Sequence, residues 1–276
     1  MKKDRDKEAL KPHWGANIMD YKTIILEKSK GIAKITFNLP DRMNFLDLVM
    51  REELKDAFVD IGADRDIKVV IMTGAGKAFI AGSDITTMEG VTAPAARDRL
   101  KSVQKLIRLM TELEKPIIAA VNGFATGAGL HIALACDIVI ASDAAKFREA
   151  FIMIGLVPDL GGFYFLPLRV GLARAKELML TGRIIDAKEA ESIGLVNKVV
   201  PHAELEREAL ELAGSLAQGP TRAYGMIKSA LNHWPMNLPA FLEMEANMQS
   251  VAFAIRDFDE GRRAFLEKRK PAYTGE

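Results

Sequence analysis

The sequence predicts an α/β fold built on a parallel sheet, followed by a helical C-terminal region. The apolar runs IKVVIMTG, KPIIAAVNG and CDIVIAS alternate with segments of helical period. Strands that are apolar throughout are typical of parallel sheets covered by helices on both faces. From Leu172 onward the pattern changes to helices separated by short breaks. We therefore divide the chain into a flexible arm (1–19), an α/β core (20–215) and a helical region (216–276).

The composition is that of an ordinary globular protein. Of the 276 residues, 49% are hydrophobic and 27% are charged. The net charge of +1 gives no overall excess of positive charge that would bind nucleic acid or an anionic membrane. No window approaches the roughly 18 consecutive apolar residues of a membrane span. The arm lacks the apolar core of a signal peptide. The single cysteine, Cys136, lies in an apolar run that predicts a buried, inert thiol, which fits a cytoplasmic protein.

The N-terminal part of the core predicts a hairpin and a helix. TIILEKS and GIAKITFN are β-rich runs separated by Lys30 and Gly31, which predicts a tight hairpin. The period of LDLVMREELKDAFVDIGAD then predicts a helix. Its inward positions are Leu48, Leu54, Ala57, Phe58 and Ile61.

The remaining elements follow in the same alternating order. We expect helices over residues 93–113 and from about Gly127, between the apolar runs. Further helices are predicted in LARAKELMLTG, AKEAESIG and AELEREALELAGSLAQ, with a small strand in LVNKVV. The tail after Pro220 is helical and carries one apolar stripe, which predicts either core packing or a subunit interface. The stripe consists of Phe241, Met244, Met248, Val251 and Ile255.

Two glycine-rich segments suggest access to backbone amides. Residues 127–129 lack the third glycine of a dinucleotide fingerprint, and residues 74–77 lack the spacing of a phosphate loop. Glycines at a helix start let a ligand approach unpaired N–H groups, which favour developing negative charge, although a tight packing turn is the alternative explanation. In AFIAGSDI, Gly82 and Ser83 offer a second such amide. Two facing amides are what the enolate of a thioester needs.

These segments, in their order and spacing, resemble one enzyme family over residues 20 to 270. The motifs are RMNFLD, VVIMTGAGKAFIAGSDI, KPIIAAVNGFATGAGLHIALACDIVIAS, GLVPDLGGFYFLPLRVG and ARAKELMLTGRIIDAKEAESIGLVNKVV. The sequence looks like a member of the enoyl-CoA hydratase/isomerase (crotonase) superfamily. GLVPDLGGFYFLP especially resembles the epoxyphenylacetyl-CoA and enoyl-CoA isomerases of that superfamily.

The resemblance implies a spiral of β-β-α turns and a C-terminal region that forms homotrimers, often paired as hexamers. It implies an acyl-CoA substrate, with coenzyme A as part of the substrate and no separate cofactor. The oxyanion amides would be those of Ser83 and Ala128, with Gly127 and Phe151 beside them. The groove for the adenine and pantetheine would be lined by Asn44, Phe45, Leu46, Ala81, Gly82, Asp84 and Ile85.

Departures from the hydratase pattern favour isomerisation. The two glutamates of family hydratases fall here on His131 and Phe151, and Phe151 cannot take a proton. Adding water across a double bond needs one group that deprotonates the water and a source of the α-proton, so the loss of both carboxylates argues against ordinary hydration. Asp159, between Pro158 and a glycine pair, matches the aspartate of members that shift double bonds. Its alternative is a turn or N-cap aspartate.

Two neighbouring side chains have open roles. His131 is either a polar side chain packed near the pocket or a hydrogen-bond donor or weak acid beside the acyl group. Glu149 is expected to be a surface glutamate paired with Arg148; alternatively it faces the same way as Phe151 and partly replaces the missing carboxylate. The other histidines are scattered, so no metal site is expected.

The sequence thus predicts an acyl-CoA isomerase. Asp159 would remove a proton from the γ-carbon, and the dienolate would be reprotonated at the α-carbon. The alternatives are hydration of an unusual enoyl-CoA, for example a cyclic one, and a non-catalytic acyl-CoA-binding subunit. Aromatic residues predict room for a ring or a bulky acyl chain, unless they belong to the core. They are Phe79, Phe124, Phe151, Phe163 and Tyr164.

Overall fold

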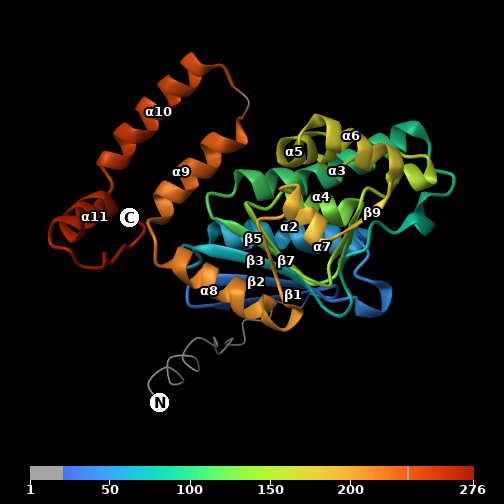
Figure 1. The fold of residues 1–276 in the computed structure, drawn as a ribbon, viewed down its shortest axis with the longest axis horizontal. Coiled ribbons are helices and arrows are strands. Elements are labelled where there is room, and N and C mark those ends of the chain that lie inside the picture. Colours follow the sequence, from blue (N-terminus) through green and yellow to red (C-terminus); the bar gives the residue numbers. More distant parts are fainter. Residues whose placement is uncertain (1–20, 235) are drawn as a thin grey trace.

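The computed structural model describes residues 21–234 and 236–276 (Figure 1). The flexible arm predicted for residues 1–19 lies outside the described residues. Two sheets and the helices around them form the core, and three helices follow at the C-terminal end.

The larger sheet has six strands in the order β1-β2-β3-β5-β7-β10. All neighbours are parallel except β1 and β2, which form the predicted hairpin. Lys30 and Gly31 both have positive φ, 49° and 81°, as a two-residue hairpin turn with the right twist requires. The strands are β1 (Ile24–Ser29), β2 (Ile32–Phe37), β3 (Val69–Gly74), β5 (Ile117–Val121), β7 (Ile138–Ser142) and β10 (Lys198–Val200).

The smaller sheet consists of strands of three residues each. Its order is β4 (Ala78–Ile80), β6 (Phe124–Thr126), β8 (Lys146–Arg148) and β9 (Ile184–Asp186). The strands follow one another in pairs: β3–β4, β5–β6 and β7–β8. In each pair the first strand belongs to the larger sheet and the second to the smaller one, and helices come after the pair. This is the predicted spiral of β-β-α turns.

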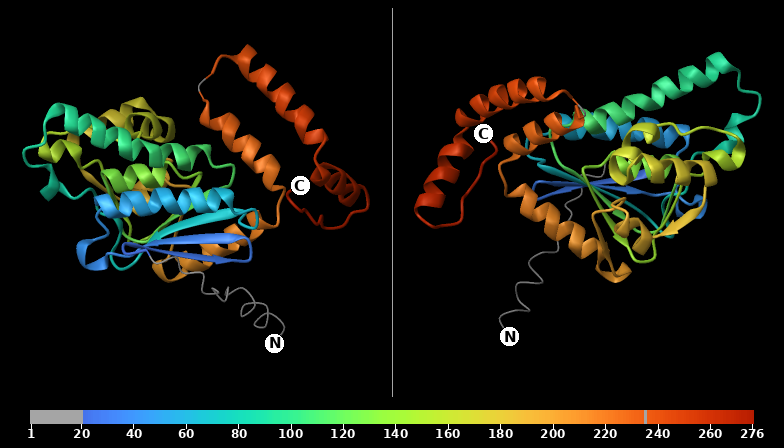
Figure 2. Two further views of the ribbon diagram at one scale, coloured as in Figure 1. Left: turned by 180° about the vertical axis from the view of Figure 1, so that it is seen from behind. Right: turned by 45° about the horizontal axis from the view of Figure 1, so that its top comes forward.

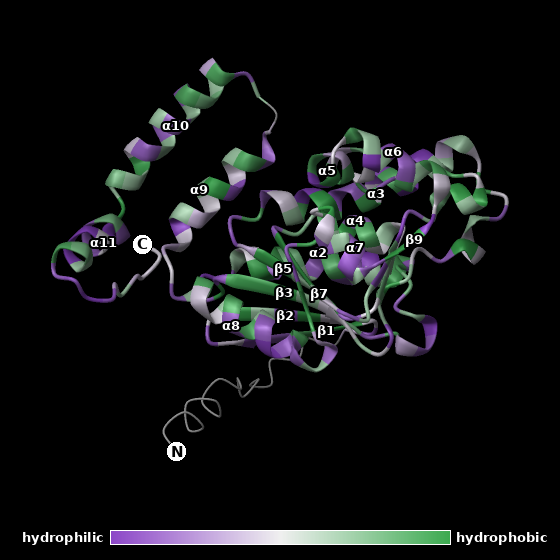
Figure 3. Ribbon diagram, in the orientation of Figure 1, coloured by the Kyte–Doolittle hydropathy of each residue, from purple (hydrophilic) through white to green (hydrophobic). Residues whose placement is uncertain are grey.

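Helices cover both faces of the larger sheet, as the apolar strands predicted. On one face α8 packs Leu205, Ala209 and Ala213 against strand residues such as Ile71 and Ile118. The opposite face shares a core with α2, α3 and α4, and the strands are the most continuously hydrophobic part of the ribbon (Figure 3). The core helices are α2 (Leu48–Ala63), α3 (Ala93–Glu112), α4 (Ala128–Leu134), α5 (Gly162–Val170), α6 (Leu172–Thr181), α7 (Ala187–Ser192) and α8 (Leu205–Ala217). Short 3-10 turns span Pro40–Arg42, Ile85–Met88, Phe151–Ile154 and His202–Glu204.

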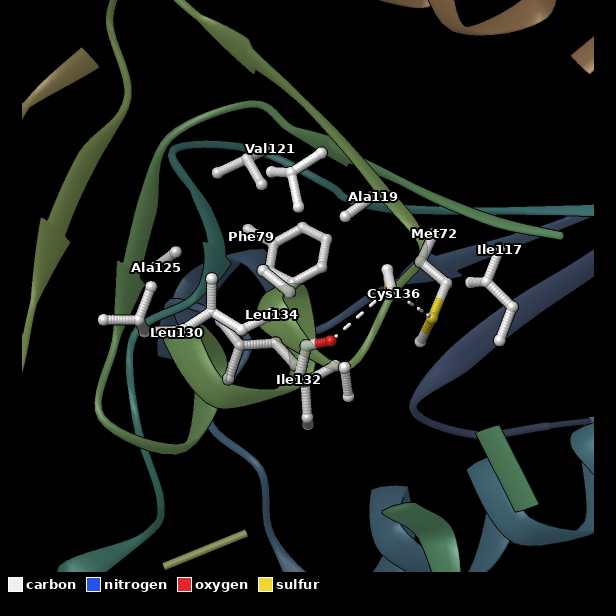
Figure 4. Packing of buried hydrophobic residues seen from close by; sticks show 14 of the residues in the cluster. Met72, Phe79, Ile117, Ala119, Val121, Ala125, Leu130, Ile132, Leu134 and Cys136 are labelled. Atoms are coloured by element: carbon white, nitrogen blue, oxygen red, sulfur yellow. Dashed lines mark hydrogen bonds between the residues drawn. The ribbon is translucent and has the colours of Figure 1, made fainter. Parts of the chain in front are cut away.

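Cys136 is buried, as predicted. Its thiol packs among Met72, Phe79 and Leu134 and donates to the Ile132 carbonyl at 3.4 Å (Figure 4). Burial raises the pKa of this thiol far above its usual range, so it stays protonated and unreactive.

One predicted inward position of α2 is wrong. Leu48 is 55% exposed, whereas the other four predicted positions are buried. Leu48 is the first residue of the helix, directly after the N-cap Asp47, and the inward position of this first turn is occupied by the buried Met50 instead.

The C-terminal region is mainly helical, as predicted, but residues 267–276, for which a helix was also expected, form none. It contains α9 (Thr221–Asn232), α10 (Leu238–Phe253) and α11 (Arg256–Leu266). Helix α9 packs on α3, whereas α10 and α11 extend away from the core (Figure 2). Within the predicted stripe only Phe241 is buried, and Val251 is 58% exposed, so core packing does not account for the stripe. None of the helices in residues 21–234 and 236–276 has the length and apolar character that crossing a membrane requires.

Candidate active site

The candidate site lies where three neighbouring strands of the smaller sheet end. Strand β4 pairs with β6, and β6 pairs with β8, in both cases in parallel. The carboxyl ends of parallel neighbours lie at one edge of a sheet. Ser83, Ala128 and Glu149 follow these three ends, so the small sheet gathers segments that are far apart in the sequence.

The amides predicted to bind the thioester oxygen have no acceptor in the part of the chain that the structure describes. Neither the Ser83 nor the Ala128 N–H donates to a described residue. Gly127, which precedes Ala128, has φ +52°, a conformation that favours glycine. A Cβ on Gly129 would lie 2.0 Å from the Ile80 carbonyl oxygen, so only glycine lets the start of α4 approach the end of β4 this closely.

The two predicted groove segments lie side by side. The Leu46 amide donates to the Gly82 carbonyl at 2.9 Å, and the Ala81 amide donates to the Met43 carbonyl at 3.1 Å. Leu46 and Ser83 form an isolated parallel bridge. The structure therefore brings residues 44–46 and 81–85 together beside the Ser83 amide.

Asn44 is fully occupied by main-chain groups. Its amide nitrogen donates to the carbonyls of Ala75 at 2.9 Å and Ala78 at 2.7 Å, and its oxygen accepts from the Leu39 amide at 2.8 Å. Its φ of 55° lies in the left-handed region, which asparagine tolerates better than most residues. Any contact of Asn44 with a ligand would therefore come from its backbone.

Asp84 also has a local structural role. It accepts hydrogen bonds from the Thr86 amide at 3.1 Å and the Thr86 hydroxyl at 2.6 Å, and it pairs with Arg42 at 2.8 Å. The Thr86 hydroxyl is the main cause that holds the pKa of Asp84 below its usual range. Ile85 follows and is 55% exposed, while Phe45 is half-buried. Phe45 and Ile85 thus contribute apolar surface to this segment, and hydrogen bonds hold the Asp84 carboxylate in place.

His131 and Glu149 form a buried pair. The His131 Nε2 lies 2.8 Å from the Glu149 Oε1, and both side chains are almost completely inaccessible. The expectation of a surface glutamate paired with Arg148 is wrong: the Arg148 Nε donates instead to the Gly182 carbonyl at 2.6 Å. Glu149 follows β8 at its buried end, so alternation along the strand directs it inward. The Glu149 Oε2 and the His131 Nδ1 have no partner among the described residues.

The His131 ring is tightly enclosed. Phe151 stacks on it with ring centroids 5.1 Å apart and an interplanar angle of 9°. A Cβ on Gly162 would lie 2.1 Å from the His131 Cε1, so the ring lies directly against the backbone where α5 begins. His131 therefore packs directly on the start of α5, which follows Asp159 in the sequence.

The other aromatic residues do not form one acyl pocket. Phe79 lies in the core, with its ring edge-on to Phe37 at 5.0 Å. Phe163 and Tyr164 are 61% and 41% exposed on α5, and Phe124 is 39% exposed. Of the predicted aromatic lining, Phe151 is the member next to the site residues.

Asp159 is a half-buried residue in the turn before α5. The Gly162 amide donates to the Asp159 main-chain carbonyl at 2.8 Å, which closes the turn before α5. The side-chain Oδ1 is buried and has no partner among the described residues. Burial raises the pKa of Asp159; His131 and Arg51 oppose this shift, and Glu149 adds to it. The carboxyl is therefore not the satisfied turn aspartate that was the alternative explanation.

Arg51 lies in the same region and was not among the site residues predicted from the sequence. Its guanidinium is buried in α2 and reaches Ser83. It precedes Leu54 by three residues, so it falls on the inward face of the helix. A charged residue on an otherwise apolar face was the signal that could have identified it.

A cleft lies next to the residues of the candidate site. It has a volume of about 830 Å³ between α3, α5 and α9, and it reaches Leu160 and Gly161, which follow Asp159. Neither Ser83, Ala128 nor Asp159 lines it. We therefore locate the site by its convergent polar groups rather than by the size of this cleft.

Comparison with known proteins places the chain in one family. Residues 27–276 match the model of the enoyl-CoA hydratase/isomerase family. The chain is 41% identical to a crotonyl-CoA hydratase of Syntrophomonas wolfei, over 91% of this chain and 98% of that protein. It is 39% identical to a 1,2-epoxyphenylacetyl-CoA isomerase of Escherichia coli, again over 91% and 98%.

Solved structures agree. An enoyl-CoA hydratase from Bacillus anthracis superposes with a TM-score of 0.88 at 36% identity, covering 92% of this chain and 100% of that one. These named relatives are enzymes, so the alternative of a non-catalytic binding subunit is not supported. The fold, the strand-end site and these similarities lead to one conclusion: the chain is an enzyme of the enoyl-CoA hydratase/isomerase family, the crotonase superfamily.

Proposed function

We propose that this enzyme isomerises the double bond of an enoyl-CoA thioester, with Asp159 as the acid/base. The observation that carries the proposal is the buried, unpartnered Asp159 carboxyl oxygen. The hydratase glutamate positions hold His131 and Phe151, which leaves Asp159 as the carboxyl without an assigned partner. A single carboxylate suffices for a proton shift.

The mechanism needs two amides and one carboxylate. The thioester oxygen would accept hydrogen bonds from the Ser83 and Ala128 amides, which have no described protein acceptor. Asp159 takes a proton from the γ-carbon; the C–H electron pair moves into the chain and the oxygen takes up the charge as a dienolate. The protonated Asp159 then returns a proton to the α-carbon, which completes the shift and regenerates the carboxylate.

The electrostatics of Asp159 suit this role. Burial raises its pKa, which brings its basicity closer to neutral pH than that of an exposed aspartate. His131 and Arg51 oppose the shift. A raised pKa favours a carboxyl that both accepts and returns a proton during the reaction.

The direct test is the variant Asp159→Asn, assayed with a 3-enoyl-CoA, which enters the same equilibrium from the other side. Loss of a general acid/base typically costs about 10²- to 10⁴-fold in rate, and we expect a decrease of kcat in that range. Isomerisation at nearly the wild-type rate would rule out Asp159 as the acid/base.

One observation favours hydration as a second candidate. Glu149 is buried and has an unpartnered oxygen, so a carboxylate is present near the position where Phe151 replaces a glutamate. Glu149 would activate water and Asp159 would protonate the α-carbon. The variant Glu149→Gln, assayed in water enriched in heavy oxygen, separates the two functions. Isomerisation incorporates no label and tolerates the substitution, whereas hydration gives a labelled alcohol and loses about 10²- to 10⁴-fold in rate.

We further propose that the chain assembles into a homotrimer or homohexamer through its C-terminal helices. Several of their apolar side chains are exposed, including Leu238 at 68%, Phe253 at 58% and Phe265 at 83%. An apolar groove of about 390 Å³ lies between α9, α10 and α11. Exposed apolar surface of this kind is typical of a subunit interface.

A further inference from the structure

Arg51 is a buried cation with few protein partners. Only 6% of the residue is exposed. Its Nη2 donates to the Leu46 carbonyl at 3.2 Å and to the Ser83 hydroxyl at a long 3.4 Å. The Nε is buried and donates to no described group, and within residues 21–234 and 236–276 no carboxylate lies within ion-pair distance of the guanidinium.

Such an arrangement is costly unless a ligand completes it. A guanidinium carries five N–H donors, and burying them without acceptors opposes folding. Buried charges in proteins are usually paired, and Arg51 in the described structure is not. The unused donors therefore indicate an acceptor that arrives from outside the protein.

The position of Arg51 identifies that ligand as the acyl group. Arg51 contacts Ser83, whose amide is a proposed donor to the thioester oxygen. Burial and Arg99 lower the pKa of Arg51, whereas the Asp159 carboxylate raises it, so Asp159 is among the charges that act on the guanidinium. The acyl carbons from the α-carbon to the δ-carbon would then lie between the Ser83 amide, Asp159 and Arg51.

We propose that Arg51 is a substrate-binding residue that donates to an oxygen on the δ-carbon of the acyl chain. This inference rests on the proposed function of the site, because it takes the Ser83 amide and Asp159 as the fixed points. An uncharged oxygen, such as a ketone, is favoured because the Asp159 carboxylate would repel a second anion. The γ-carbon of such a substrate keeps the proton that Asp159 removes.

The test measures binding of three matched saturated thioesters by titration calorimetry: hexanoyl-CoA, 5-oxohexanoyl-CoA and glutaryl-CoA. We expect 5-oxohexanoyl-CoA to bind the wild-type protein on the order of tenfold more tightly than hexanoyl-CoA, as a hydrogen bond to a charged donor allows. Arg51→Met should abolish this preference and leave the Kd of hexanoyl-CoA within about twofold, and Arg51→Lys should keep part of it. Glutaryl-CoA should gain less than the ketone.

Arg169→Met is the matched control, because burial also lowers the pKa of Arg169, which donates to the Cys136 carbonyl instead. It should keep the wild-type preference. Equal binding of the ketone and the hydrocarbon by the wild-type protein would overturn the proposal, and so would equal weakening of both by Arg51→Met. The probes have no double bond, so this result does not depend on which reaction is catalysed. A failure of the isomerase proposal would appear instead in the Asp159→Asn kinetics.

Discussion

At the scale of single residues, the structure changes the role of His131 and Glu149. The residue types are evident in the sequence, but their pairing, with His131 Nε2 2.8 Å from Glu149 Oε1, is not. From the sequence, Glu149 either faces inward by strand alternation or pairs with Arg148 at the surface. At the end of a strand of three residues, the direction in which a side chain points is undetermined until the neighbouring strands are known. The position of Asp159 followed from the family resemblance, whereas its burial and its unpartnered oxygen required the structure.

The pair should behave as a coupled unit in stability. Replacing His131 by Leu leaves the Glu149 carboxylate buried without its partner, which we expect to cost about 3–5 kcal/mol in the free energy of unfolding. The double variant His131→Leu/Glu149→Met removes both polar groups and should recover much of that loss. Urea unfolding of the single and double variants measures the coupling. Additive losses would show that the two side chains do not act together.

Asp159 should destabilise the fold at neutral pH. Its folded pKa is raised, mainly by burial, so its stabilising contribution is complete below the unfolded value of about 3.9 and is lost as the pH rises through the folded pKa. Asp159→Asn should therefore be more stable than the wild type at pH 7, with the difference shrinking toward pH 4. Urea unfolding across this pH range measures it, and an Asn variant that is less stable at pH 7 would contradict the assigned shift.

At the scale of elements, the larger sheet could be predicted and the smaller one could not. Long apolar runs and the Lys30–Gly31 turn indicate the strands of the larger sheet directly. The smaller sheet is built from three-residue strands, which are too short for periodicity to reveal. It is nevertheless the smaller sheet that brings Ser83, Ala128 and Glu149 to one edge.

The start of α5 is the element most sensitive to a small change. Gly162→Ala would place a methyl group 2.1 Å from the His131 ring, which must then shift. We expect a loss of about 1–3 kcal/mol in unfolding free energy, together with reduced kcat because the Asp159 turn moves. Gly214→Ala in α8 is the control: no atom lies within 4 Å of the added Cβ, and it should stabilise the helix by about 0.5–1 kcal/mol.

Thermal unfolding and steady-state kinetics of the two glycine variants compare them directly. If Gly162→Ala keeps full activity and stability, the contact between α5 and His131 does not position the Asp159 turn. If the contact is responsible, Gly162→Ala should cost much less stability when it is introduced into His131→Ala than when it is introduced into the wild type.

At the scale of the whole molecule, helices α10 and α11 extend away from the core and leave several apolar side chains uncovered. The stripe on α10 was predicted as either core or interface, and the choice could not be made from periodicity, because both pack the same residue types. The exposed positions of Val251 and Phe265 exclude the core for these side chains.

We therefore expect the wild-type protein to elute with three or six times the mass of one chain in size-exclusion chromatography with light scattering. Val251→Asp combined with Phe265→Glu should shift it to smaller species with an unchanged circular dichroism spectrum, because both side chains are exposed in the single chain at 58% and 83%. A wild-type protein that runs as a monomer at micromolar concentration would contradict the assembly.

The central claim is that Asp159 alone moves the proton between the γ- and α-carbons. Proton NMR of a 3-enoyl-CoA in deuterated water, with wild-type enzyme and with Asp159→Asn, tests it most directly. We expect the wild type to form the 2-enoyl isomer with deuterium only at the α- and γ-carbons and no alcohol, and the variant to lose both exchange and isomerisation. Exchange by the variant at the wild-type rate, or a β-hydroxy product appearing before the isomer, would contradict it.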